Sequence, residues 1–356
     1  MSVSDFKCFD ERDCAFRNSK GKERPAPPLP KDVPLADTHC HLGMLPDPGF
    51  AIARAAHFGF GFLMCMTDPA EPRETGDSLV SAAGAYAAAC RWLEAARGHL
   101  AAWDEGDTPL PRLRFAAGVH PHNARFYEDS ESALLELLRE AATGCLGEIG
   151  LDYHYDISPR DVQREVFAAQ LRLAHETRLP VSLHIREAHD DALAILCREG
   201  VPEAGCILHC FNLDAAVLAP FLELGCHVAF GGPLTFKKSW ETRRAALDVP
   251  CERLLLETDA PFMAPEPLRG TLCTPDHSVF TMRMLLDCFG YAGAEAARAA
   301  LDPRPSDVAA GVAEPLPQLP DFAALQAGRD EAEFARRMYD NAVELLDREP
   351  TGWQRA

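Results

Sequence analysis

Three side chains that can bind a metal ion alternate along one short apolar segment. In the sequence LADTHCHLG, Asp37, His39 and His41 stand two residues apart. On a β-strand this spacing sends all three side chains to the same face, because successive side chains of a strand alternate between its faces. Packed or surface histidines can have the same spacing, so this motif alone does not define a site.

Four more apolar runs, far apart in the sequence, end in a histidine or a carboxylate. They are CLGEIGLDY with Glu148, PVSLHIRE with His184, CILHCF with His209 and LLLETDAP with Asp259. A charged group at the end of a buried strand is costly unless it is paired or bound to a metal. Imidazoles and carboxylates together suit Zn²⁺, Mn²⁺ or, less well, Mg²⁺. The sequence therefore predicts a metal site built from these four residues with His39 and His41.

Other polar residues near these motifs leave two interpretations open. Arg186, two residues beyond His184, could bind a substrate phosphate through paired hydrogen bonds or form a surface ion pair. Asp37 could orient a ligand histidine or accept a hydrogen bond from a local backbone amide. The segment TFKKSWETRR could steer a polyanion towards the site or form a solvated helix face. Its basic residues are Lys237, Lys238, Arg243 and Arg244.

The elements that must position these residues are short strands alternating with helices. Apolar runs lie near residues 35–41, 60–66, 114–120, 145–149, 181–184, 206–210, 227–231 and 253–258. Helical patterns such as SESALLELLREAA and QREVFAAQLRLAHE lie between most of them. Strands alternating with helices indicate a parallel sheet covered on both faces. Eight such units favour an α/β fold of the closed (β/α)₈ type, the TIM barrel, with the metal site at its C-terminal rim.

We expect the barrel domain to span residues 34–350. Residues 1–33 are polar, end in RPAPPLPKDVP and are expected to form a flexible N-terminal arm. Residues 302–320 contain five prolines and are expected to be an inserted surface loop. The segment DEAEFARRMYDNAVELLDRE has helical spacing, and we expect it to pack on the barrel as a closing helix.

The composition favours a cytoplasmic protein without a membrane partner. The N-terminus lacks an apolar signal core, and no apolar run reaches the length of a membrane span. The thirteen cysteines are scattered without a CxxC pair, which is typical of free thiols in a reducing compartment. A net charge of −19 counts against non-specific binding of duplex nucleic acid. It does not exclude an enzyme that holds phosphates through metal ions.

Taken together, the motifs resemble those of the TatD family of metal-dependent deoxyribonucleases, in the amidohydrolase-like barrel superfamily. The similarity covers roughly residues 35–300. It runs in family order through DTHCHL, GVHPH, GEIGLDY, LPVSLHIR, LHCF and LLLETDAPFMAP, followed by LRG. The resemblance implies two divalent ions (Mg²⁺, Mn²⁺ or Zn²⁺), one held by His39, His41 and Asp259, the other by His184 and His209, with Glu148 bridging them.

The resemblance also implies an activity. A metal-activated water would hydrolyse phosphodiester bonds of single-stranded DNA or DNA ends in the 3′ to 5′ direction, with Glu148 and Asp259 as catalytic residues. His120 and His122 of GVHPH would support the ligands or contact the substrate phosphate, and their alternative is to hydrogen-bond their own loop.

Two segments depart from the family pattern. Asn212 and Leu213 replace the usual Ser-Gly after HCF, and Cys273 and Thr274 replace the usual Asn and Glu after LRG. We expect both segments to flank the substrate entrance. Two alternatives therefore stay open: a hydrolase of small-molecule amides or phosphoesters on the same site, and an inactive metal-binding scaffold. The presence of all six expected ligands disfavours the scaffold.

Overall fold

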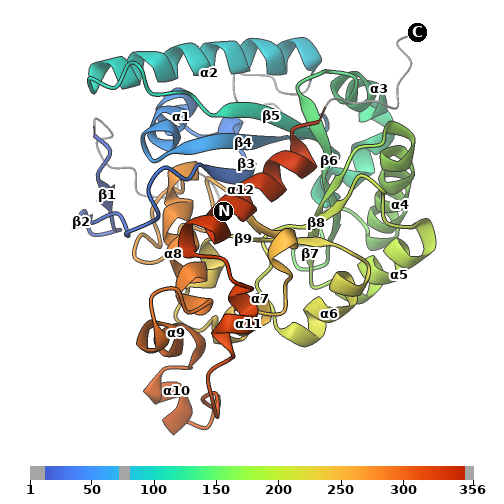
Figure 1. Cartoon of the computed structure of the whole chain (residues 1–356). Helices are drawn as coiled ribbons and strands as arrows, with labels where there is room; N and C mark the ends of the chain where they lie inside the picture. The colour runs from blue at the N-terminus through green and yellow to red at the C-terminus, as the bar shows by residue number, and fades with distance from the viewer. Residues whose placement is uncertain (1–12, 72–80, 349–356) are drawn as a thin grey trace.

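A sheet of eight parallel strands forms the centre of the molecule in the computed structural model, which describes residues 13–71 and 81–348 (Figure 1). The strands lie side by side in chain order. They are β3 (Leu35–Cys40), β4 (Phe60–Thr67), β5 (Arg112–Ala117), β6 (Thr143–Asp152), β7 (Val181–Arg186), β8 (Cys206–Leu208), β9 (His227–Phe230) and β10 (Leu254–Leu256). Each strand overlaps one of the eight predicted apolar runs, and the predicted (β/α)₈ barrel is confirmed.

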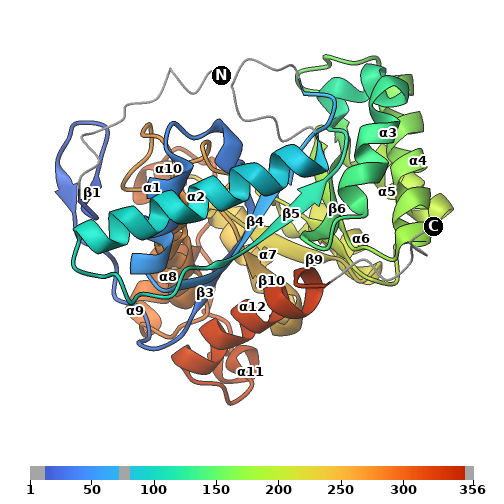
Figure 2. The same cartoon turned by 90° about the horizontal axis from the view of Figure 1, so that it is seen from above.

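Helices follow most of the strands and surround the sheet (Figures 1 and 2). They are α1 (Pro48–His57), α2 (Ala82–Ala102), α3 (Tyr127–Leu138), α4 (Arg160–Thr177), α5 (His189–Glu199), α6 (Ala215–Glu223), α7 (Trp240–Ala246), α8 (Ser278–Cys288), α9 (Ala294–Leu301), α10 (Pro305–Ala309), α11 (Phe322–Gln326) and α12 (Glu331–Leu346). Within the described ranges, none of these helices combines the length and the low polarity needed to cross a membrane.

The first and last strands of the sheet, β3 and β10, meet and close the barrel. The backbone amide of Asp259 donates to the carbonyl of His39 at 2.9 Å, and the amide of His41 donates to the carbonyl of Ala260 at 2.7 Å. These hydrogen bonds lie just beyond the C-terminal end of β10. They bring predicted ligands from opposite ends of the sequence next to each other.

The opposite end of the barrel is plugged by α12. Apolar side chains inside the barrel form one cluster with Ala342, Leu345 and Leu346 of this helix. Asn341 donates a hydrogen bond of 2.9 Å to the carbonyl of Leu254, the first residue of β10. The predicted closing helix therefore packs on the N-terminal end of the barrel. The C-terminal rim is left for the predicted site.

Residues 13–33 pack on the barrel, which differs from the flexible arm expected from the sequence. They contain a small antiparallel hairpin, β1 (Phe16–Arg17) and β2 (Glu23–Arg24). The ring of Phe16 is buried, with its centre 4.7 Å from that of Phe58 and 5.0 Å from that of Phe280. Burial of an aromatic ring is strongly favourable, and both of its partners are remote in sequence.

The proline-rich segment 302–320 contains the short helix α10 as well as loops. Two arginines of α7 hold the segment at its start. Arg243 donates to the carbonyl of Ala300, and Arg244 donates to the carbonyls of Leu301 and Glu314 at 3.0 and 3.1 Å. Two predicted boundaries, the beginning of the arm (residues 1–12) and the end of the domain (349–350), lie outside the described residues.

Candidate metal centre

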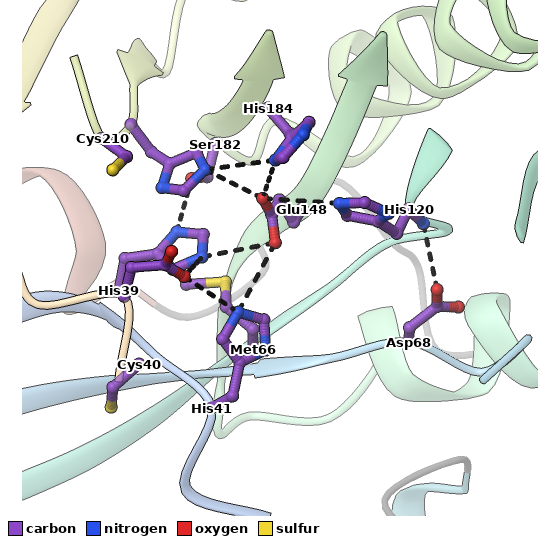
Figure 3. Close-up of polar contacts among 12 residues, drawn as sticks. His39, Cys40, His41, Met66, Asp68, His120, Glu148, Ser182, His184 and Cys210 are labelled. Atoms are coloured by element: carbon purple, nitrogen blue, oxygen red, sulfur yellow. Dashed lines mark hydrogen bonds and ion pairs between the residues drawn. The ribbon is translucent and has the colours of Figure 1, made fainter. Parts of the chain in front are cut away.

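Side chains from the C-terminal halves of different strands, or from the residues just after them, converge at the C-terminal rim of the barrel (Figure 3). The carboxylate of Glu148, on β6, lies at the centre, with imidazoles on several sides of it. All six residues predicted as ligands lie in this group. We call them the rim cluster: His39, His41, Glu148, His184, His209 and Asp259.

The first half of the rim cluster, the first half-site, consists of His39, His41 and Asp259 facing Oε2 of Glu148. His39 Nε2 lies 3.3 Å from Glu148 Oε2 and 4.0 Å from Asp259 Oδ1. His41 Nε2 lies 3.7 and 3.5 Å from the same two oxygens. Most of these separations exceed the length of an N–H···O hydrogen bond. The four groups therefore face a common space without closing it.

The second half-site consists of His184 and His209 facing the other carboxylate oxygen of Glu148. His184 Nδ1 lies 2.6 Å from Glu148 Oε1, and His209 Nε2 lies 2.9 Å from the same oxygen. The two imidazole nitrogens are 3.4 Å apart. These distances are those of direct hydrogen bonds, so the second half-site is closed by contacts among its own side chains.

Each imidazole of the second half-site also contacts a second carboxylate. His184 Nε2 lies 3.1 Å from Asp152 Oδ2, and His209 Nδ1 lies 3.5 Å from Glu257 Oε1. Asp152 and Glu257 are both fully buried, and the sequence analysis named neither of them. A carboxylate behind a ligand histidine fixes the orientation and the tautomer of the ring.

The charge of Glu148 is set by its surroundings. Burial alone would raise the pKa of this carboxyl, but the nearby imidazoles of His209, His39, His120 and His184 together hold its pKa well below the usual value. Glu148 is therefore anionic at neutral pH. A buried anion among imidazoles is the arrangement that a bridging ligand requires.

The rim cluster fits a divalent metal ion. Nε2 of His39, which faces the oxygens of Glu148 and Asp259, is buried without a hydrogen-bond partner. Such orphaned atoms are rare in folded proteins. Burial lowers the pKa of His39, which favours the neutral imidazole, and the lone pair of a neutral ring nitrogen is repelled by carboxylate oxygens. A cation between them would satisfy both groups. His39, His41 and Glu148 each offer a ligand atom within 4.8 Å of the others.

Asp37 lies behind the first half-site and joins the two ends of the sheet. Its carboxylate accepts hydrogen bonds from the amide of His39 at 3.1 Å and from the amide and hydroxyl of Thr258 at 3.1 and 2.6 Å. Burial raises the pKa of Asp37 well above its usual value. The described contacts are with backbone and hydroxyl groups rather than with an imidazole. Of the two interpretations of Asp37, the local amide contact is the one observed.

His120 and His122 follow β5 and line one side of the rim cluster. His120 Nε2 lies 3.7 Å from Glu148 Oε1, and His122 Nε2 lies 2.9 Å from Asp152 Oδ2. The amide of His120 donates to the carboxylate of Asp68 at 3.1 Å. Burial raises the pKa of Asp68 to about 7. Asp68 directly follows β4, as His41, His209 and Asp259 lie just beyond their strands, and sequence reasoning missed it.

Arg186 ends β7 at the edge of the site. Its guanidinium carbon lies 4.7 Å from the centre of the Tyr155 ring. Across the parts of the chain described, no carboxylate forms an ion pair with Arg186. The surface ion pair considered for this residue is therefore not observed, and its donors are available to a ligand.

The expected substrate entrance is only partly correct. Asn212 is exposed and Leu213 is half-buried, but Cys273 and Thr274 are both buried. The reason is that the segment after β10 folds back on itself, with the amide of Cys273 donating to the carbonyl of Pro261 at 3.0 Å. Cys273 and Thr274 therefore do not line an entrance.

The basic segment is not a charged patch. Arg243 is 4% exposed, and its guanidinium donates to the carbonyls of Leu234 and Phe236 at 2.9 and 2.8 Å. Since Arg244 is also bound to carbonyls, Lys237 and Lys238 are the exposed residues of this cluster. A buried guanidinium that binds carbonyls stabilises the fold and does not attract a polyanion.

The fold and the rim cluster together define a TIM barrel with a candidate metal centre at the C-terminal ends of its strands. Within this class the chain belongs to the TatD family. The family model described as TatD related DNase matches residues 36–302. The solved structure of YJJV, a TatD homologue from Escherichia coli K12, covers 88% of this chain and 98% of its own, with 25% identity and a TM-score of 0.61.

Curated relatives include metal-dependent hydrolases and nucleases. The uncharacterized metal-dependent hydrolase YabD of Bacillus subtilis is 38% identical over 173 residues, which are 48% of this chain and 68% of YabD. The human 3′-5′ RNA nuclease TATDN2 is 34% identical over 68% of this chain and 30% of its own length. The 3′-5′ ssDNA/RNA exonuclease TatD of Klebsiella pneumoniae is 39% identical over 43% of this chain and 59% of its own. The matches to the last two proteins thus span less than two thirds of their lengths. The chain is a metal-dependent hydrolase of the TatD family.

Proposed function

We propose that the chain is a divalent-metal-dependent deoxyribonuclease that hydrolyses phosphodiester bonds of single-stranded DNA from the 3′ end. The observation that carries this proposal is the position of Glu148, whose two carboxylate oxygens face different half-sites. A carboxylate with contacts on both sides suits a bridge between two cations. Two divalent ions about 3.5–4 Å apart are common in enzymes that cleave phosphate esters. The names of the Klebsiella and human relatives support a nucleic-acid substrate.

In this proposal the rim cluster would hold two ions. His39, His41 and Asp259 would hold one, His184 and His209 would hold the other, and Glu148 would contribute to both. Mg²⁺, Mn²⁺ and Zn²⁺ all accept such ligands. When bound, the ions supply charge neutralisation of the phosphate and lower the pKa of a water molecule.

The remaining steps belong to side chains of the chain itself. Asp259 orients the attacking water and accepts its proton. His120 and His122 face the same space and contact the phosphate, and Arg186 binds it through its free donors. Burial by the surrounding strands keeps other water away from Glu148, which is 6% exposed.

The charge of the protein favours single strands over duplexes as substrate. The net charge is −19, and two of the four residues in the basic segment are bound to carbonyl groups. Duplex DNA has a higher charge density than a single strand and depends more on an array of basic side chains. A protein that holds phosphate mainly through metal ions at the rim cluster should prefer a single strand, because a flexible strand can reach the rim of the barrel.

The experiment that tests the proposal is a cleavage assay with separate metals. Metal-free protein is supplied with Mg²⁺, Mn²⁺ or Zn²⁺ and incubated with 5′-labelled single-stranded DNA, RNA of the same sequence, or duplex DNA. We expect successive shortening of the single strand from its 3′ end, absence of cleavage by Glu148→Gln, and full activity of the matched surface variant Glu128→Gln.

Each other outcome favours a different activity. No cleavage with any of the three ions, together with turnover of small amides or phosphoesters, would assign the site to a small-molecule hydrolase. Tight metal binding without turnover of any substrate would favour the inactive scaffold. Faster cleavage of RNA than of DNA would identify RNA as the preferred substrate.

A further inference from the structure

Several exposed apolar side chains lie in loops at the same end of the barrel as the rim cluster. Seven large hydrophobic side chains are exposed among the residues that the structure describes. Four of them lie in segments that follow β5, β6 or β10 at the C-terminal end of the barrel: Phe126, Tyr155, Ile157 and Met263. Single exposed apolar residues are common on proteins. Four on the same end as a candidate catalytic centre point to a substrate with an apolar face.

The loop that carries Tyr155 is held in place before any substrate binds. Tyr155 lies between β6 and α4, and its residue is 49% exposed. Oδ1 of Asp152 accepts hydrogen bonds from the amides of His154 and Tyr155 at 3.0 and 2.8 Å. Further along the loop, Nε2 of Gln163 donates to the carbonyl of Ser158 at 2.7 Å. A ligand that binds to this loop loses little affinity to loop ordering.

Three side chains surround the Tyr155 ring and leave the residue half exposed. The guanidinium of Arg186 lies over the ring, 4.7 Å from its centre. The rings of His122 and His154 meet it in T-shaped contacts, with their centres 5.4 and 4.9 Å from that of Tyr155. The exposed part of Tyr155 lies outside these three contacts and is available to a ligand.

Tyr155 is also one side chain away from the rim cluster. The ring of His122 lies 4.3 Å from that of His120 and 6.1 Å from that of His184, measured between ring centres. The side chain of Arg186, whose donors are free, lies on the same side. A phosphate at the rim cluster would therefore have the guanidinium of Arg186 and the exposed ring of Tyr155 within about one nucleotide of it.

We propose that the exposed part of the Tyr155 ring stacks on a base of the single-stranded substrate, adjacent to the phosphate that is cleaved. This inference rests on the proposed nuclease function and adds a binding subsite to it. Every nucleobase has a flat π face, so such a platform accepts any sequence. The guanidinium of Arg186, which lies over the ring, adds a cation–π interaction and would lie close to the backbone phosphate. Stacking is largely non-ionic, and it explains how a protein with a net charge of −19 can retain a polyanion.

The test compares three tyrosine variants on two substrates. Tyr155→Ala removes the platform, Tyr155→Phe keeps the ring, and Tyr86→Ala removes a tyrosine of α2 that is 68% exposed. Each is assayed with single-stranded DNA and with the same strand carrying abasic residues at its 3′ end. Substrate affinity is measured separately by fluorescence anisotropy with a phosphorothioate-linked strand that resists hydrolysis, so that binding is observed without turnover and without a change at the rim cluster.

We expect Tyr155→Ala to raise KM and Kd for normal DNA about tenfold, within the range of base–aromatic stacking, with a small change in kcat. Tyr155→Phe and Tyr86→Ala should behave like the parent protein, and the effect of Tyr155→Ala should vanish on the abasic strand. Equal affinity of Tyr155→Ala and parent for normal DNA would overturn the platform while leaving the nuclease function intact. An equal loss on the abasic strand would show a structural effect on the loop and would also overturn it. If the parent binds DNA but does not cleave it, the function fails, and the anisotropy comparison still decides the role of Tyr155.

Discussion

The two half-sites of the rim cluster share Glu148 but differ in how their side chains are satisfied. In the first half-site, His39 and His41 stand 3.3–4.0 Å from the oxygens of Glu148 and Asp259. In the second, His184 and His209 contact Glu148 at 2.6 and 2.9 Å and are backed by Asp152 and Glu257. The first half-site is open, and the second is closed on itself.

This difference between the half-sites predicts which of them binds a cation more tightly. An ion that enters the first half-site meets atoms that lack good partners and therefore breaks few contacts. An ion that enters the second must replace two direct hydrogen bonds to Glu148, each contributing about 1.5–3 kcal/mol because a charged group is involved. We therefore expect unequal affinities, with the first half-site filled at the lower metal concentration.

The largest expected effect is that of removing the proton acceptor of the first half-site. Asp259→Asn should lower kcat about 10³-fold or more, because a ligand and the group that takes the proton of the attacking water are lost together. KM should change little. Steady-state assays with single-stranded DNA measure this, and the exposed Asp129→Asn serves as the control. A loss of less than tenfold would contradict the assigned role.

Removal of the second half-site should leave the first one occupied. His184→Asn is expected to retain about one tightly bound ion per chain where the parent binds about two, and to lose most of its activity. Elemental analysis after dialysis, followed by calorimetric titration, gives the stoichiometry and both affinities. Loss of all bound metal in His184→Asn would show that the half-sites do not bind metal independently and would contradict the proposed difference between them.

The carboxylates behind the second half-site should have smaller effects, limited to that half. Glu257→Gln and Asp152→Asn are each expected to weaken the second metal-binding step about 10- to 100-fold, because the histidines lose the groups that orient them. The first binding step should be unchanged. The same titration separates the two steps, and an equal weakening of both would argue for general misfolding.

The smallest effect concerns stability. A divalent ion at about 100 times its Kd stabilises the folded chain by about 2.7 kcal/mol, which corresponds to a rise in Tm of roughly 4 °C for a domain of this size. His184→Asn should keep part of this shift, and Glu148→Gln should lose nearly all of it. Scanning calorimetry with and without metal provides the values. A full shift in Glu148→Gln would exclude Glu148 as a shared ligand.

Much of the fold was accessible from the sequence because the signals were local. Each barrel strand is a short apolar run, and its alternation with helices predicts a parallel barrel. The residues of the rim cluster were accessible for the same reason, since a histidine or carboxylate at the end of a buried apolar run stands out in the sequence. The packing of Phe16 against Phe58 and Phe280 was not predictable from the sequence, because it depends on contacts between residues far apart in the chain.

Sequence reasoning missed three carboxylates beside the rim cluster, Asp68, Asp152 and Glu257, and misplaced two other residues. Glu257 stands two residues before Asp259, and Asp152 stands four after Glu148, so strand alternation placed both on the same faces as the named ligands. Asp152 and Glu257 could therefore have been predicted from the sequence. The burial of Cys273 and Thr274 could not have been predicted, because it depends on how the segment after β10 folds back, and this path leaves no periodic pattern in the sequence.

The central claim is that Glu148 lies between two divalent ions. Anomalous diffraction from crystals grown with Mn²⁺ tests it most directly, because the ions are located without reference to activity. We predict two anomalous peaks, one beside His39, His41 and Asp259 and a weaker one beside His184 and His209, with an oxygen of Glu148 coordinated to each. Peaks that both lie away from Glu148, or no ordered ion at the rim under saturating Mn²⁺, would contradict the account.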